Sequence, residues 1–315
     1  MSELFRVYLE TSALNIFAEN SSVAGAIETK KHQNKNGRGW YLSPVVLAEV
    51  LLTKDELIRE TLIMFAQHAC EPTLLPSPEE LMINYINAGC PKYEEKYDLV
   101  SKGPIAHEWK AICEDPRKTM GFGAETVESI NKSMKKIPKI IFNFSKTGIV
   151  DLSSIGAETG TLSIELLMQQ FSLVQDDQKN DADYLAHTKL VTLFILMFMC
   201  AGLGIDSQTI DDFWERKGVT SMLDRVSKIF TEHPELVHTG PFHQMACMMK
   251  TQTVSKYRRG VYFDCMHTIY AIYADLFIAK DADFREFRTG ISKLGMDTKK
   301  LLLYDELEIL RISPA

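Results

Sequence analysis

The chain lacks several patterns that would place it in a class at once. Its six cysteines show neither paired zinc-type spacing nor a compact disulfide framework, which predicts reduced and mostly buried thiols. The longest apolar run, 190–205, is shorter than the ~20 residues of a membrane span and predicts a buried helix. No basic-then-apolar signal opens the sequence. We therefore expect a cytoplasmic protein with no membrane partner.

A basic excess is also missing. The formal net charge is −7, with 42 acidic residues against 35 basic ones, whereas nucleic-acid binders need a basic surface for phosphate contacts. Any RNA binding would depend on local basic patches. Hydrophobic residues at 45% and charged residues at 24% are typical of a globular protein, and 315 residues suffice for one large or two ordinary domains.

Acidic residues gather instead around a short apolar run late in the chain. Asp264 lies near the start of a predicted helix, 261–274, and Asp281 follows a predicted strand, 276–278. Open parallel sheets place their ligand sites at the carboxyl ends of strands, where a helix leading into a strand can bring the two acids together. The spacing is therefore compatible with one divalent-metal site.

Two more acids in this segment have a structural alternative. Asp275 fits a residue that caps a turn, and Asp283 fits a residue that caps the next helix, because Asp often takes such positions. Asp283 is also a candidate fifth metal ligand.

A strand that ends in an acid also opens the chain. The β-rich run 6–9 is followed by Glu10, and a helical apolar pattern begins after Thr11 and Ser12. Either hydroxyl could cap this helix or donate a hydrogen bond to a substrate phosphate.

A second early strand, 40–42, leads into a predicted helix with Ser43 as its N-cap and Pro44 at its first position. Glu49 interrupts the apolar surface of this helix. An unpaired carboxylate against a core is costly, so Glu49 should have a partner such as a metal, a cation or water.

The segments YLETSALN, LSPVVLAEVLL and DCMHTIYAIYADLFIAKDADF are together similar to the PIN-domain nucleases, over roughly the first ninety and last sixty residues. The resemblance implies that the metal ligands are Glu10, Glu49, Asp264 and Asp281, with Asp283 as a fifth acid. The family usually has Asp where this chain has Glu10. The extra methylene moves this carboxylate outward, and Mg²⁺ requires near-ideal octahedral geometry.

The implied fold is an α/β/α three-layer sandwich with a mostly parallel sheet, interrupted by an all-α insertion. Its parts are a first PIN-like segment 1–90, a helical insertion 91–253 and a second PIN-like segment 254–315. The candidate strands are 6–9, 40–42, 73–75, 276–278 and 300–303. The candidate helices of the insertion are 93–115, 124–134, 160–175, 181–201, 207–216, 221–230 and 242–257.

The implied function is that of a metal-dependent endoribonuclease with Mg²⁺ or Mn²⁺ as cofactor. Carboxylate oxygens suit these ions, which can activate a water for phosphodiester hydrolysis. Lys256, Arg258 and Arg259 are candidate RNA contacts, with a solvated helix face as the alternative. A catalytically impaired scaffold that binds a partner through the insertion, and a phosphatase or DNA nuclease, are the other hypotheses. A protein inhibitor and an oligomer are compatible with the sequence.

Overall fold

A four-stranded parallel sheet forms the centre of the protein. The computed structural model describes residues 5–19, 21–78, 80–81, 104–114, 143, 147, 149–151, 161–163, 244–246, 248, 259–280, 282–293 and 301–306. The strand order is β2-β1-β5-β6, where the strands are β1 (Phe5–Leu9), β2 (Arg38–Tyr41), β5 (Leu276–Ala279) and β6 (Leu301–Leu303). All three pairings are parallel. The expected α/β fold with a parallel sheet is confirmed at this general level.

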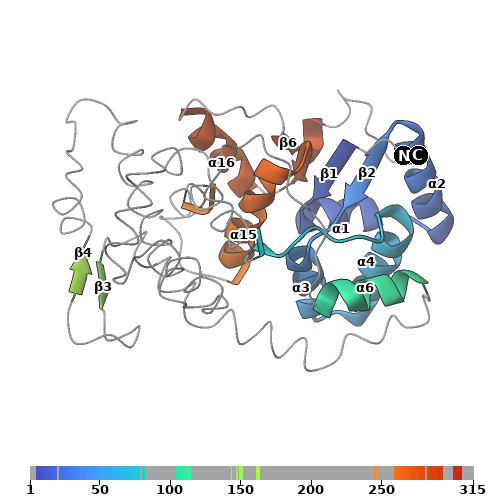
Figure 1. Ribbon diagram of the computed structural model, residues 1–315, viewed down its shortest axis with the longest axis horizontal. Coiled ribbons are helices and arrows are strands. Elements are labelled where there is room, and N and C mark those ends of the chain that lie inside the picture. Colours follow the sequence, from blue (N-terminus) through green and yellow to red (C-terminus); the bar gives the residue numbers. More distant parts are fainter. Residues whose placement is uncertain are drawn as a thin grey trace, which may run out of the picture.

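Segments from both ends of the chain build this sheet. In Figure 1 the blue elements of the early chain pack against the orange and red elements of the late chain. The central pair joins them, since Tyr8 of β1 lies opposite Phe277 of β5. The first strand and the strand before Asp281 are therefore neighbours.

Several of the helices begin at a capping residue. They are α1 (Thr11–Glu19), α2 (Val23–Lys35), α3 (Pro44–Leu52), α4 (Glu56–Ala69), α6 (Pro104–Glu114), α15 (Arg259–Tyr273) and α16 (Ala282–Lys293). Ser43 caps α3 by accepting a hydrogen bond from the backbone N–H of Val46 at 3.4 Å, with Pro44 at the first position as predicted. Asp55 caps α4 in the same way through Ile58 at 3.1 Å.

Helices cover both faces of the sheet. Tyr8 stacks on Tyr270 of α15 at a ring-centroid distance of 4.6 Å, and its cross-strand neighbour Phe277 contacts Phe284 of α16 at 5.4 Å. On the other face Trp40 contacts Phe17 of α1 at 4.7 Å. Because successive strand residues point to opposite faces, the full burial of consecutive residues in β1 and β5 requires this double cover.

One predicted strand is wrong. Residues 73–75 have no strand conformation, although Leu75 donates a backbone hydrogen bond to Leu42 at 2.9 Å beside the end of β2. Pro72 and Pro76 flank the segment. Proline has no N–H to donate, so a regular ladder along β2 cannot continue through them.

The expectation of an all-α insertion is also wrong. Strands β3 (Ile149–Asp151) and β4 (Thr161–Ser163) form an antiparallel pair within it, and β4 replaces the start of the predicted helix 160–175. The β-branched residues Ile149, Val150 and Thr161 favour this pairing. Helix α6 falls within the predicted helix 93–115, and residues 244–246 and 248 are helical as expected for 242–257.

The remaining helices predicted for the insertion, and the apolar run 190–205, lie outside the described residues. In the part of the chain that the structure describes, no helix is both long and apolar enough to cross a membrane.

Candidate metal-binding site

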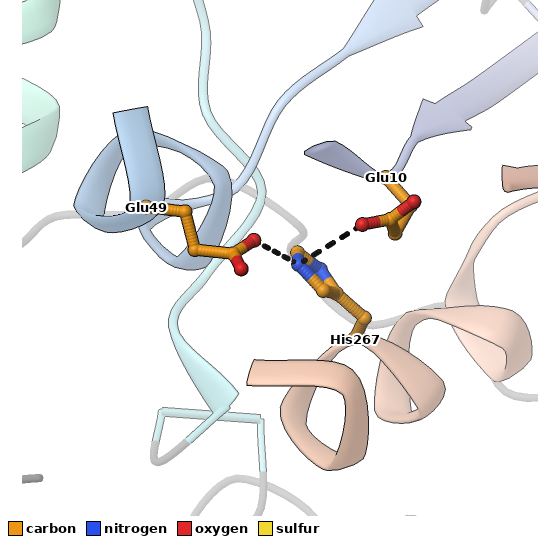
Figure 2. Close-up of side chains that lie close together, drawn as sticks. All are labelled: Glu10, Glu49 and His267. Carbon is orange, nitrogen blue, oxygen red and sulfur yellow. Dashed lines mark hydrogen bonds and ion pairs between the residues drawn. The ribbon is translucent and has the colours of Figure 1, made fainter. Parts of the chain in front are cut away.

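Three side chains converge at the carboxyl end of β1. Glu10 follows this strand, Glu49 comes from α3 and His267 from α15 (Figure 2). The potential ligand atoms of the three residues all lie within 4.8 Å of one another. His267 Nε2 is 2.7 Å from Glu49 Oε2 and 3.9 Å from Glu10 Oε1. Two carboxylates and one imidazole nitrogen thus face one small volume.

Glu10 is held by the first residues of α1. Ser12 donates two hydrogen bonds to Glu10 Oε2, one from its backbone N–H at 2.9 Å and one from its hydroxyl. The same hydroxyl accepts from the backbone N–H of Lys280, just after β5, at 3.0 Å. Ser12 therefore fixes the Glu10 carboxylate between the ends of the two central strands.

Burial makes Glu10 an unusual carboxyl group. Its exposed fraction is 2%, and this burial raises its pKa to about 7. The neighbouring His267 and the hydrogen bonds from Ser12 oppose that rise, whereas the nearby Glu49 carboxylate adds to it. A cation among these groups would offset both the burial and the repulsion.

Glu49 has the partner that the sequence requires. Its Oε2 accepts a hydrogen bond from the Thr11 hydroxyl and lies 2.7 Å from His267 Nε2. The side chain keeps 18% of its surface exposed, so it is the most accessible of the three converging residues. Thr11 and Ser12 therefore both turn toward carboxylates, each holding a different one.

His267 is fully buried and is bound on both ring nitrogens. Its Nδ1 is 2.6 Å from the Tyr8 hydroxyl, which is itself 2.9 Å from Ser43 Oγ. A chain of polar contacts thus runs from Glu49 through the imidazole and Tyr8 to the cap of α3.

Two of the acids predicted on the late segment, Asp264 and Asp283, lie within the described residues. Asp264 is 9% exposed and lies one turn before His267 on α15, outside the group formed by Glu10, Glu49 and His267. Asp283 lies in the first turn of α16. Burial raises the pKa of the Cys265 thiol well above its usual value, and the charges of Asp264 and Asp283 add to this rise. Both acids therefore lie near Cys265.

Asp275 has a structural role, which it fulfils through contacts with Arg6 of β1 and not through the expected capping of a turn. It accepts a hydrogen bond from the backbone N–H of Arg6 at 2.8 Å and pairs with the Arg6 guanidinium at 3.8 Å. Asp281, Lys256 and Arg258 lie outside the described residues. Arg259 begins α15, but its side chain is outside the described part of the structure.

His267 was not among the predicted site residues, and its polar contacts with Tyr8 and Glu49 depend on the fold. Its spacing of three from Asp264 was the available signal, because residues three apart lie on the same side of a helix.

The protein is an α/β protein with a buried Glu-Glu-His group at the carboxyl edge of a parallel sheet. Comparison with protein-family models, curated proteins and solved structures gives no match.

Proposed function

We propose that the protein is a PIN-like, metal-dependent endoribonuclease that hydrolyses RNA phosphodiester bonds. The observation that carries this proposal is the convergence of Glu10 and Glu49, from separate elements, at the carboxyl end of the central strands. The PIN resemblance assigns both acids to one metal site, and their convergence from positions 39 residues apart in the sequence supports that assignment.

The arrangement of the sheet adds support. Helices on both faces and the parallel pairing of β1 with β5 are what an α/β/α sandwich of the PIN type requires. In this proposal segments 1–90 and 254–315 form the catalytic domain, and the insertion 91–253 shapes substrate access or mediates assembly.

The donor set fits a divalent cation. Carboxylate oxygens from Glu10 and Glu49 are the ligands that Mg²⁺ and Mn²⁺ prefer, and the burial of Glu10 favours a compensating positive charge. Asp264 and Asp281 would complete the site directly or through water. When bound, the metal supplies an activated water and stabilises charge on the phosphoryl oxygens. Ser12 and Thr11 keep the two carboxylates oriented toward it.

A basic side chain stands at the edge of this site. Lys280 directly follows β5, its backbone N–H contacts Ser12, and the residue is exposed. We place an RNA phosphate near Lys280, with Lys256, Arg258 and Arg259 as further contacts along the substrate. These local charges would counter the acidic balance of the chain.

The direct test is RNA cleavage by the purified protein in Mn²⁺ or Mg²⁺. We expect cleavage that is lost in chelator and in the single variants Glu49→Gln, Asp264→Asn and Asp281→Asn. Asp275→Asn is the matched control, because Asp275 binds Arg6 instead of the site. Cleavage that persists in all three site variants would show that these acids do not catalyse the reaction.

A second candidate is a metal-free scaffold. Ser12 donates to one oxygen of Glu10, and Thr11 and His267 contact one oxygen of Glu49, so each carboxylate has hydrogen-bond partners without an ion, which favours this alternative. Isothermal titration with Mn²⁺ separates the two. The nuclease should bind Mn²⁺ and lose this binding in Glu49→Gln, whereas the scaffold should show no carboxylate-dependent binding.

A further inference from the structure

We propose that His267 is a nitrogen ligand of this metal site, that Tyr8 and Ser43 orient its ring for that role, and that it makes the site select Mn²⁺ over Mg²⁺. The inference rests on the metal site of the proposed function, but it does not require that the protein cleave RNA.

The ring of His267 presents the correct atom. Nε2 points to the two carboxylates, at 2.7 Å from Glu49 and 3.9 Å from Glu10, while Nδ1 points away from them (Figure 2). Nε2 therefore shares the volume in which a cation would meet both carboxylates. Since the ligand atoms already lie within 4.8 Å of one another, small side-chain movements would suffice to enclose an ion.

The opposite side of the ring is fixed. The Tyr8 hydroxyl lies 2.6 Å from Nδ1, and the Tyr8 ring packs against Tyr270 at 4.6 Å and Phe277 at 5.3 Å. His267 and Tyr8 are both completely buried. Metal-binding histidines in proteins almost always use their second nitrogen in such a hydrogen bond, which sets the tautomer and the ring orientation.

The Tyr8 hydroxyl can form a hydrogen bond with either tautomer of the His267 imidazole, because it contacts both His267 Nδ1 and Ser43 Oγ. With the imidazole proton on Nε2, which donates to Glu49, Tyr8 donates its own proton to Nδ1. For a metal to bind Nε2, the imidazole must carry its proton on Nδ1 instead. Tyr8 then accepts from Nδ1 and donates to Ser43 Oγ, 2.9 Å away. Ser43 Oγ is thus the hydrogen-bond acceptor for the Tyr8 hydroxyl when the metal is bound.

A nitrogen ligand changes which ion the site prefers. Mg²⁺ favours oxygen donors and loses its water reluctantly, whereas imidazole is a common ligand of first-row transition metals. A site of two carboxylates and one imidazole should therefore bind Mn²⁺ more tightly than Mg²⁺. Four carboxylates alone would give a weaker preference.

The deciding experiment is pulsed electron paramagnetic resonance of Mn²⁺ bound to the full-length protein. We expect a ¹⁴N coupling from a directly bound imidazole, absent in His267→Gln and retained in His68→Gln, which changes a histidine of α4 outside the site. Titration calorimetry should show that His267→Gln loses the preference for Mn²⁺ over Mg²⁺. Mn²⁺ that binds the wild-type protein without a nitrogen coupling would overturn the inference, and this measurement needs no variant.

The roles of Tyr8 and Ser43 have their own test. Tyr8→Phe and Ser43→Ala should each weaken Mn²⁺ binding about 10- to 100-fold, the range typical for partners of a ligating histidine, and should change Mg²⁺ binding much less. Tyr270→Phe is the matched control, since it removes a buried hydroxyl that donates to the Pro76 carbonyl at 2.7 Å. Equal losses in Tyr8→Phe and Tyr270→Phe would mean that Tyr8 acts through packing alone.

These outcomes are independent of catalysis. A protein that shows the nitrogen coupling but cleaves no RNA would contradict the nuclease and leave His267 as a ligand. A protein that cleaves RNA with Mn²⁺ but shows no nitrogen coupling would support the nuclease and contradict the assignment of His267 as a metal ligand.

Discussion

The buried carboxyl group of Glu10 makes the metal-free protein sensitive to pH. Its pKa is about 7 in the folded protein against an ordinary value of 4.5, so the folded state binds this proton more tightly than the unfolded state. The stabilising contribution is complete below pH 4.5 and is lost as the pH rises through 7. At about 1.4 kcal/mol per pKa unit, the loss is of the order of 3 kcal/mol.

Urea unfolding in the presence of chelator, at pH 5 and pH 8, measures this effect. Other groups titrate over the same range, so the quantity to compare is the difference between wild type and Glu10→Gln. We expect Glu10→Gln to gain stability relative to wild type as the pH rises. A difference that stays constant from pH 5 to pH 8 would mean that Glu10 titrates normally in the folded protein.

The contribution of the Lys280 ammonium group to RNA binding can be measured separately from metal binding. In Lys280→Gln the backbone N–H that contacts Ser12 is retained, while the exposed ammonium group is lost. We expect weaker RNA binding, a shallower dependence of the affinity on salt, and unchanged Mn²⁺ affinity. Fluorescence anisotropy with a labelled RNA at several salt concentrations measures the RNA affinity and its dependence on salt.

Lys35→Gln is the control for this change. Lys35 ends α2, just before β2, and is exposed like Lys280. The substitution Lys35→Gln removes one positive charge, as Lys280→Gln does, but near the amino ends of the parallel strands and away from the site. An equal loss of RNA binding in both variants would indicate a general charge effect and no phosphate contact at Lys280.

Individual site residues were predictable from the sequence to different degrees. Glu10 stood out because an acid directly follows a β-rich run, and Glu49 because a carboxylate interrupts an apolar helix face. His267 did not, since histidine at a buried helical position is compatible with plain packing. Its polar role depends on Tyr8 and Glu49, which are remote in sequence, and only the fold brings them within hydrogen-bonding distance.

The start of α4 provides a test of local helix stability. Asp55 accepts from the backbone N–H of Ile58, and its loss leaves that donor without its cap. Asp55→Ala should cost about 1 kcal/mol, while Asp55→Asn, which can still accept, should cost clearly less. Thermal unfolding measures both variants. Equal destabilisation would assign the effect to the charge of Asp55 and not to the capping bond.

Strands and helices were predictable where local signals agreed. The pattern of β-rich runs located β1, β2, β5 and β6 to within one or two residues, and Ser43-Pro44 marked the start of α3. The segment 73–75 contains two leucines but lies between prolines, so its pairing with β2 stops at isolated hydrogen bonds. At 161–163 a cross-strand partner outweighed the helical pattern that follows in the sequence.

Metal binding should stabilise the folded protein as a unit. A ligand that binds only the folded state, at 100 times its Kd, adds about 2.7 kcal/mol to the free energy of unfolding. We therefore expect Mn²⁺ to raise the melting temperature of the wild-type protein but not that of Glu49→Gln. Calorimetry with and without Mn²⁺ tests this, with Asp275→Asn again as the control. A rise of equal size in Glu49→Gln would place the stabilising ion elsewhere.

The pairing of β1 with β5 also determines when the site can exist during synthesis. Val7 is paired with Leu276, so the central strands of the sheet are separated by nearly the full length of the described chain. A ribosome that has made the first seventy residues has produced Glu10 and Glu49 but neither β5 nor His267. If the protein is a nuclease, a nascent chain that ends before β5 cannot attack RNA, because the site lacks its central strand pair until translation has passed Ala279.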